Sequence, residues 1–317
     1  MAGAFTIAEK ELWDKIGSKR FLIMFGLVVL ISANTAYNGV SYVKMNPHEG
    51  FNYIYSGYMS GVSFLFIMVF FGPIVGLAMG FDAVNRERTN GTLSVLLSQP
   101  IYRDSVINGK LLAGAGVLSI LVFGTVGIMT GVAIPNLGYG PTFDEFLRIL
   151  TFTVLTTLYL VFWQSLGMLY SVLTKKTSIS IFASIATWLV FSLFIIIFAG
   201  IIANALIPLP ESRFISGESQ RPQRTQEYYE ARDKRHKLTE QISRLSPTNL
   251  YSEAANSILG VEGFTIFTSS AQNNRDQSLV QALVNNWANI TSIIVALVIC
   301  TASSYIMVLR MEIRPGE

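Results

Sequence analysis

The chain has 317 residues, of which 51% are hydrophobic and 14% are charged, and its formal net charge is +3. An average soluble domain carries about 25% charged residues, so this composition excludes an ordinary soluble globular protein and indicates a membrane protein. The small net charge also gives no reason to expect nucleic acid as a partner.

Six long apolar runs follow one another along the chain. A helix rises about 1.5 Å per residue, so about 18 or more apolar residues can cross a hydrocarbon core of about 30 Å. The runs are continuous, unlike the alternating strands of a barrel, and this predicts an all-α membrane protein with six transmembrane helices. The expected spans are 21–43, 58–84, 111–134, 146–173, 179–207 and 287–309.

The distribution of Lys and Arg predicts the orientation of these spans, because basic residues in short loops resist translocation. The short loops on one side hold only Lys44 and Arg148. The other side holds Lys10, Lys15, Lys19, Arg20, Arg86, Arg88, Arg103, Lys110, Lys175, Lys176, Arg310 and Arg314. We therefore expect a multi-pass protein of the plasma membrane with both termini in the cytoplasm.

The first span has a second interpretation, as a cleaved signal peptide, since SKRFLIMFGLVVLISANTA combines a basic flank, an apolar core and small residues. A long basic region and the lack of a clear A-x-A site favour a retained span. The expected organisation is then a cytoplasmic interfacial helix at 1–20, five spans at 21–207, an extracytoplasmic segment at 208–286, and the sixth span with a cytoplasmic tail at 287–317.

The N-terminal stretch FTIAEKELWDKIGSKR is amphipathic. The apolar positions on one face are Phe5, Ala8, Leu12 and Ile16, and the charged positions mostly opposite are Glu9, Lys10, Asp14 and Lys15. Such a helix is expected to lie in the membrane interface before the first span, with a solvated helical lead-in as the alternative.

A polar insert, NRERTNGTLSVLLSQPIYR, separates the second and third apolar runs at 85–103. Asn90-Gly91 favours a turn, and Leu93, Leu96 and Leu97 share one helical face that should end before Pro100. A short helix with an apolar face flanked by arginines suits a groove on a soluble partner. In the alternative interpretation, these leucines pack back on the protein's own spans.

The segment 208–286 carries nine basic and nine acidic residues and is therefore electrically balanced. Residues 224–245 have the period of an amphipathic helix that ends at Ser246-Pro247. The residues after Pro247 predict a second, more apolar helix, capped by Ser246 or Thr248. This second helix is expected either to pack on or dip into the membrane, or to belong to a small soluble cap.

The sequence offers few candidate residues for catalysis or for metal binding. There is no G-x-x-x-x-G-K-[ST] phosphate loop, so the chain is not expected to be an ATPase, and His48 and His236 have no ligand partners at metal-binding spacing. The methionines Met59, Met68 and Met79 favour core packing over a copper path. The polar residues inside the predicted spans include Gln164, Ser165 and Asn204. For these we favour hydrogen bonding between helices over lining of a transport pathway.

From Asp82 to Lys110 the chain reads DAVNRERTNGTLSVLLSQPIYRDSVINGK, which resembles the cytoplasmic loop signature of type-2 ABC transporter permeases. That family comprises six-span membrane subunits of ATP-driven exporters and includes the permeases of nitrous-oxide-reductase maturation. The N-terminal KELWDKIGSKRFLIMF and the later SPTNLYSEAA are also similar to segments of that family. The long outer segment departs from its compact members.

The resemblance implies a permease subunit that couples ATP hydrolysis in a separate cytoplasmic ABC ATPase to movement of a substrate. ATP and Mg²⁺ would bind to that partner, no cofactor or metal to this chain, and a second permease copy would complete a homodimer or heterodimer. The residues implied in the ATPase contact are Glu87, Arg88, Gly91, Thr92, Leu93, Leu96, Leu97, Pro100 and Arg103, with Lys175 and Lys176 as a smaller contact. An extracytoplasmic binding protein stays open as a further partner. The alternative function is mechanotransmission or assembly on an envelope partner, without a transported substrate.

Overall fold

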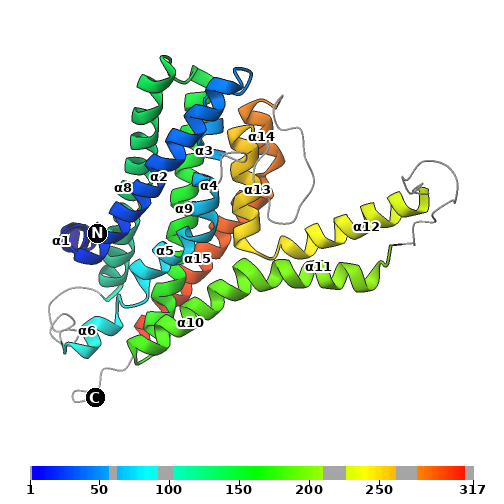
Figure 1. Ribbon diagram of the computed structural model, residues 1–317. Coiled ribbons are helices and arrows are strands. Elements are labelled where there is room, and N and C mark those ends of the chain that lie inside the picture. Colours follow the sequence, from blue (N-terminus) through cyan, green and yellow to red (C-terminus); the bar gives the residue numbers. More distant parts are fainter. Residues whose placement is uncertain (1, 57–62, 92–102, 210–225, 262–276, 311–317) are drawn as a thin grey trace, which may run out of the picture.

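The computed structural model describes residues 2–56, 63–91, 103–209, 226–261 and 277–310, and these residues are mainly helical (Figure 1). Five helical stretches are long and apolar enough to cross a membrane, and a bent pair makes a sixth. The five are α2 (Lys19–Met45), α8 (Arg103–Leu137), α9 (Phe143–Leu173), the continuous α10 (Thr177–Leu189), η1 (Val190–Phe194) and α11 (Ile195–Leu206), and α15 (Trp287–Leu309). The predicted all-α membrane class is confirmed.

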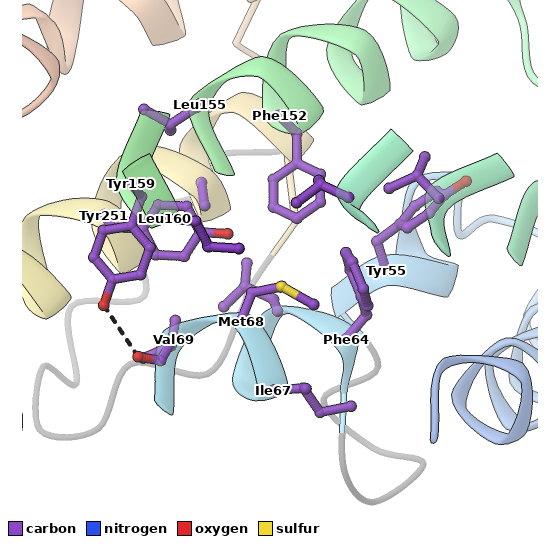
Figure 2. Close-up of a cluster of buried hydrophobic side chains, with 14 of the residues drawn as sticks. Tyr55, Phe64, Ile67, Met68, Val69, Phe152, Leu155, Tyr159, Leu160 and Tyr251 are labelled. Carbon is purple, nitrogen blue, oxygen red and sulfur yellow. Dashed lines mark hydrogen bonds between the residues drawn. The ribbon is translucent and has the colours of Figure 1, made fainter. Parts of the chain in front are cut away.

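The second span is broken between α4 (Phe64–Phe70) and α5 (Gly72–Gly80), and the bend there is 43°. Pro73 has no N–H, so the carbonyl of Val69, four residues earlier, loses its normal helical donor. The buried hydroxyl of Tyr159 on α9 donates to this carbonyl oxygen at 3.1 Å (Figure 2). The kink therefore leaves no unsatisfied carbonyl at Val69, which lies in the buried core.

The helix α9 lies at the centre of the bundle, where it contacts α5, α8, α10, α13 and α15, and it is the most buried of the five unbroken spans. The approach of α5 to α9 is close enough to require glycine. A Cβ atom on Gly76 would lie 2.5 Å from the carbonyl oxygen of Leu160, and one on Gly80 would lie 2.7 Å from the amide nitrogen of Met168. Small residues that let backbones approach are typical of helix contacts in membranes.

The first helix, α1 (Ala2–Ile16), runs across the spans and packs on α8 (Figure 1). The helix predicted in this region is present, and its position in the membrane interface stays a prediction. Phe5 is 66% exposed, whereas Ile7 meets Gly109 of α8 and Leu12 packs on the core. Lys15, expected on the charged face, turns inward and donates to the carbonyl of Met79 at 3.1 Å.

The second helix of the outer segment, α13 (Pro247–Leu259), is buried among the spans. It packs on α9, α15, α4 and the short helices α3 (Tyr53–Ser56) and α14 (Leu279–Asn285). Ser246 caps its start, and Gly260, with φ of 66°, ends it. The ring of Tyr251 stacks on Tyr159 of α9 with centroids 4.2 Å apart. The helix dips into the bundle, and the soluble cap is not what the structure shows.

The first helix of the outer segment, α12 (Gln226–Ser243), agrees with the one predicted at 224–245 and packs along α11. Together α11 and α12 project away from the bundle (Figure 1). At their base lies η1, a π-helical turn. Its Ser192 bonds to Thr248 of α13 with 2.8 Å between hydroxyl oxygens, and the Phe191 carbonyl accepts from the Ser246 hydroxyl. The start of α13 is therefore fastened to this turn.

Candidate coupling surface

The polar insert begins with α6 (Asn85–Thr89), which is bonded to the last turn of α9. The hydroxyl oxygen of Ser171 accepts from the amide nitrogens of Val84 at 3.0 Å and Asn85 at 3.1 Å. The side-chain amide of Asn85 donates to the hydroxyl of Thr174 at 3.0 Å. Because these groups are buried or partly buried, the bonds fix the direction in which the insert leaves the bundle.

The guanidinium of Arg88 extends this attachment to the turn between α9 and α10. Its Nη1 donates to the carbonyl oxygen of Thr174 at 3.0 Å, and the exposed Lys175 and Lys176 follow directly. Val84, the end of α9 and Val308 near the end of α15 also share a small apolar cluster. The structure thus brings α6 at the start of the insert, the dilysine turn and the end of the last span to one end of the bundle, here called the near end.

The buried side chain of Lys110 joins the helices α8, α6 and α1. The Nζ of Lys110 on α8 lies 2.7 Å from Glu87 of α6 and 2.8 Å from Glu11 of α1, and the Lys110 side chain is only 5% exposed. Burial would raise the pKa of the Glu11 carboxyl, but the charge and hydrogen bond of Lys110 outweigh it and lower that pKa below its usual value. The Glu11 carboxyl is therefore expected to be ionised at neutral pH, and the two ion pairs of Lys110 tie α1 to α6.

A second ion pair holds the end of the bent span to the first span. Arg20 Nη1 lies 2.7 Å from the Asp82 carboxylate and the guanidinium lies over the ring of Phe81, 5.8 Å from its centroid. The Arg20 side chain is 64% exposed, so this pair is worth less than the Lys110 pairs.

The structure describes some of the expected contact residues and not others. Glu87 and Arg88 face inward and brace the surface, while Gly91 is exposed and has φ of 70°, as the predicted turn requires. Arg103 opens α8, and its side chain is not described. The remaining predicted residues, which lie outside the described ranges, are Thr92, Leu93, Leu96, Leu97 and Pro100.

Several residues that shape this surface were not predicted from the sequence. Asn85, Ser171 and Thr174 form the bonds between α6 and α9, and Glu11 meets Lys110 across 99 positions of sequence. Lys110 belongs to the loop signature, which gave a signal for its importance but none for its partners. A pairing of residues so far apart leaves no trace in local periodicity.

The other polar residues singled out in the spans behave differently from one another. Gln164 donates from Nε2 to the Leu111 carbonyl on α8 at 3.1 Å, which confirms interhelical bonding at that position. Ser165 bonds within α9 to the Phe162 carbonyl, and Asn204 is exposed on α11. Met68 and Met79 are buried in the core, and Met59 lies outside the described ranges. Within the described residues no group of three His, Cys, Asp or Glu side chains is arranged to hold a metal.

The chain was also compared with known proteins. The family model described as "ABC-2 family transporter protein" matches residues 5–313. A protein named "Probable ABC transporter permease protein NosY" from Stutzerimonas stutzeri is 27% identical over 217 residues, which cover 68% of this chain and 74% of that protein. A protein of the same name from Pseudomonas aeruginosa is 27% identical over 139 residues, or 43% of this chain and 48% of that protein.

The family match extends over nearly the whole chain and includes both the spans and the insert. It agrees with an all-helical bundle whose polar insert and dilysine turn share one end. The chain belongs to the ABC-2 family of transporter proteins and is a membrane permease subunit of an ABC system.

Proposed function

We propose that this permease couples ATP hydrolysis in a separate cytoplasmic ABC ATPase to the movement of a substrate across the membrane. In this proposal the near end faces the cytoplasm, as the distribution of Lys and Arg favours. The ATPase binds ATP and Mg²⁺, and two permease copies form the transport unit.

The observation that carries the proposal is the bond from Arg88 to the Thr174 carbonyl. It joins the insert to the dilysine turn, so a partner that presses on one also moves the other. Ser171 and Asn85 fasten the same insert to α9, the central helix of the bundle. Motion at the near end therefore has a direct path into the span core.

The proposal is tested with the permease co-expressed with its ABC ATPase and purified as a complex in lipid. Substitution of Leu93, Leu96 and Leu97 by Asp is expected to abolish both co-purification and substrate-stimulated ATPase activity, because three carboxylates cannot enter an apolar groove. The charge reversals Lys175→Glu and Lys176→Glu together should weaken the complex less. A complex that survives the leucine substitutions with full stimulated activity would refute the assignment.

A matched control places Asp on exposed apolar residues at the far end of the bundle. Tyr139 is 50% exposed and Phe143 is 78% exposed. The double variant Tyr139→Asp/Phe143→Asp should keep the ATPase bound. Loss of the complex in this control would mean that added negative charge disrupts the protein in general.

A further inference from the structure

The start of α13 lies near the middle of the membrane, as two spans independently indicate. Ser246, its capping residue, bonds to Phe191, which is at the midpoint of the 30-residue span Thr177–Leu206. The hydroxyl oxygen of Thr248, in the first turn of α13, lies 3.2 Å from that of Tyr159, which is close to the midpoint of the 31-residue helix α9. Because both contacts are made at the middle of a candidate span, we expect the start of α13 near the middle of the membrane.

The end of α12 must then also lie at the depth of the hydrocarbon. The connection from Ser243 to Ser246 is a tight turn closed by a 3.0 Å backbone bond between these residues. Such a turn spans less than about 7 Å, and each helical residue adds about 1.5 Å, which puts Gln241 within about 10 Å of Ser246. Half of the hydrocarbon core is about 15 Å thick. The last turn of α12 therefore lies within the depth of the hydrocarbon core.

That last turn carries exposed charge. Arg244 and Glu240 form an ion pair of 2.8 Å whose side chains are 53% and 30% exposed, and Gln241 between them is exposed. Both ions also interact electrostatically with Glu253 on α13. The Glu253 carboxylate accepts from the side-chain amides of Asn249 at 2.8 Å and Asn289 at 3.1 Å. Polar contacts therefore continue from the end of α12 onto α13 and the start of α15, where Asn249 and Asn289 are buried.

The neighbouring helix α11 has the opposite character. It contains no ionisable side chain, and its outer face exposes Ile197, Phe198 and Ile201. This face suits lipid, whereas charged groups at membrane depth are found facing protein or a water-filled cavity. The two sides of the α11–α12 arm are thus built for different surroundings.

We propose that α12, together with Glu253 of α13, lines a water-filled vestibule, which opens on the side opposite the near end and reaches about half-way into the membrane. Arg244, Glu240 and Glu253 form its floor. Its chemistry suits hydrophilic, charge-bearing molecules rather than lipids. The statement about cargo rests on the proposed transport function, whereas the vestibule itself does not.

The test uses the full-length chain in intact membranes, with the single native cysteine replaced by Cys300→Ser. A membrane-impermeant charged maleimide is applied from the side opposite the near end to Gln241→Cys and to the matched control Ile197→Cys. Ile197 is 46% exposed and lies five residues from Ser192, as Gln241 lies five from Ser246. Tyr139→Cys, at the far end of the bundle, gives the rate for an accessible site.

Gln241→Cys is expected to react at a rate close to that of Tyr139→Cys, and Ile197→Cys about 100-fold more slowly, because apolar surroundings disfavour the reactive thiolate. Protection of Gln241→Cys in membranes, with labelling restored after denaturation, would show that lipid or a second copy covers α12 and would overturn the vestibule. Equal labelling of both sites would place the whole arm in water and overturn it as well.

The labelling result and the ATPase experiment fail separately. Labelling reports only whether α12 meets water, and needs no partner or substrate. Loss of the ATPase contact would leave the vestibule standing without a known cargo. If Gln241→Cys does not accumulate in membranes, Arg244→Cys, three residues further along on an exposed position, replaces it with the same expected outcomes.

Discussion

Arg88 donates a hydrogen bond from Nη1 to the carbonyl oxygen of Thr174 at 3.0 Å, and together with the bond from Asn85 to the Thr174 hydroxyl it joins two loops that are 86 positions apart. Arg88→Met removes a charged donor, whose bonds are worth about 1.5–3 kcal/mol. The turn at Lys175 and Lys176 should then open locally about 10- to 100-fold more often. Tryptic cleavage after these lysines, followed by mass spectrometry of the purified protein, measures the change.

The matched control for this substitution is Arg86→Met. Arg86 is exposed on the same helix, α6. Cleavage at the dilysine turn should be unchanged in this control. If both variants accelerated cleavage equally, the effect would come from charge or helix stability and not from the bond to Thr174.

Lys110 is expected to be the most sensitive charged residue of the near end. Lys110→Met leaves Glu11 and Glu87 facing each other without their cation, and removal of one partner of a buried ion pair costs about 3–5 kcal/mol. Denaturant unfolding in detergent should show a clear loss of stability. The triple variant Lys110→Met/Glu11→Gln/Glu87→Gln should recover most of it, and a triple variant as unstable as the single one would argue against the charge-based account.

The docking of α1 should depend on pH through Glu11. Its pKa lies below the usual value of 4.5, so the folded state favours the ionised carboxylate. The resulting stabilisation is complete above that usual value and is lost as the pH falls through the lowered pKa. The protection of the α1 amides against hydrogen exchange, relative to the intrinsic exchange rate at each pH, should therefore fall below about pH 4.5. Glu11→Gln should remove this added acid sensitivity, while Glu9→Gln, at an exposed position, should keep it.

The contact between α5 and α9 predicts opposite effects for two similar substitutions. In Gly76→Ala the new methyl group meets the α9 backbone at 2.5 Å, so we expect a loss of about 1–3 kcal/mol from overpacking. In Gly131→Ala nothing lies within 4 Å of the new atom, so the better helix propensity should leave stability unchanged or raise it by up to about 1 kcal/mol. Thermal unfolding in detergent compares them, and similar effects would contradict the close approach.

Tyr159 and Pro73 should be coupled although they do not bond to each other. Tyr159→Phe leaves the Val69 carbonyl without a donor, which costs about 1–3 kcal/mol for a buried group. Pro73→Ala restores an N–H four residues after Val69, so the same Tyr159→Phe change should cost less in that background. A double-mutant cycle on unfolding free energies measures the difference. Strict additivity would show that Tyr159 does not compensate the proline.

The spans could be predicted because each is a continuous apolar run, and the limits of α12 followed from helical periodicity and the Ser-Pro stop. The position of α13 could not, since its amphipathic pattern fits a membrane surface, a soluble cap or a buried helix equally well. What places it inside is long-range packing, such as Tyr251 on Tyr159. In the candidate site, Gly91 was predictable from its turn chemistry, whereas the partners of Lys110 depend on how α1 crosses α8.

The helix α1 packs on α8 through residues other than its most hydrophobic ones. Ile7 contacts Gly109 of α8, while Phe5 and Trp13 are exposed. A membrane interface accepts exposed aromatic side chains, so hydrophobicity alone does not define the packed face of such a helix.

The central helix α9 is one continuous helix that connects the two ends of the bundle. At one end it holds the insert through Ser171, and at the other its Arg148 donates to the carbonyl oxygens of Ile258 at 3.3 Å and Gln277 at 2.5 Å. With 31 residues it is about 46 Å long, so pivoting it by only about 5° would displace one tip by about 4 Å relative to the other. A small tilt of α9 would therefore shift the groups bonded at its two ends by more than the length of a hydrogen bond.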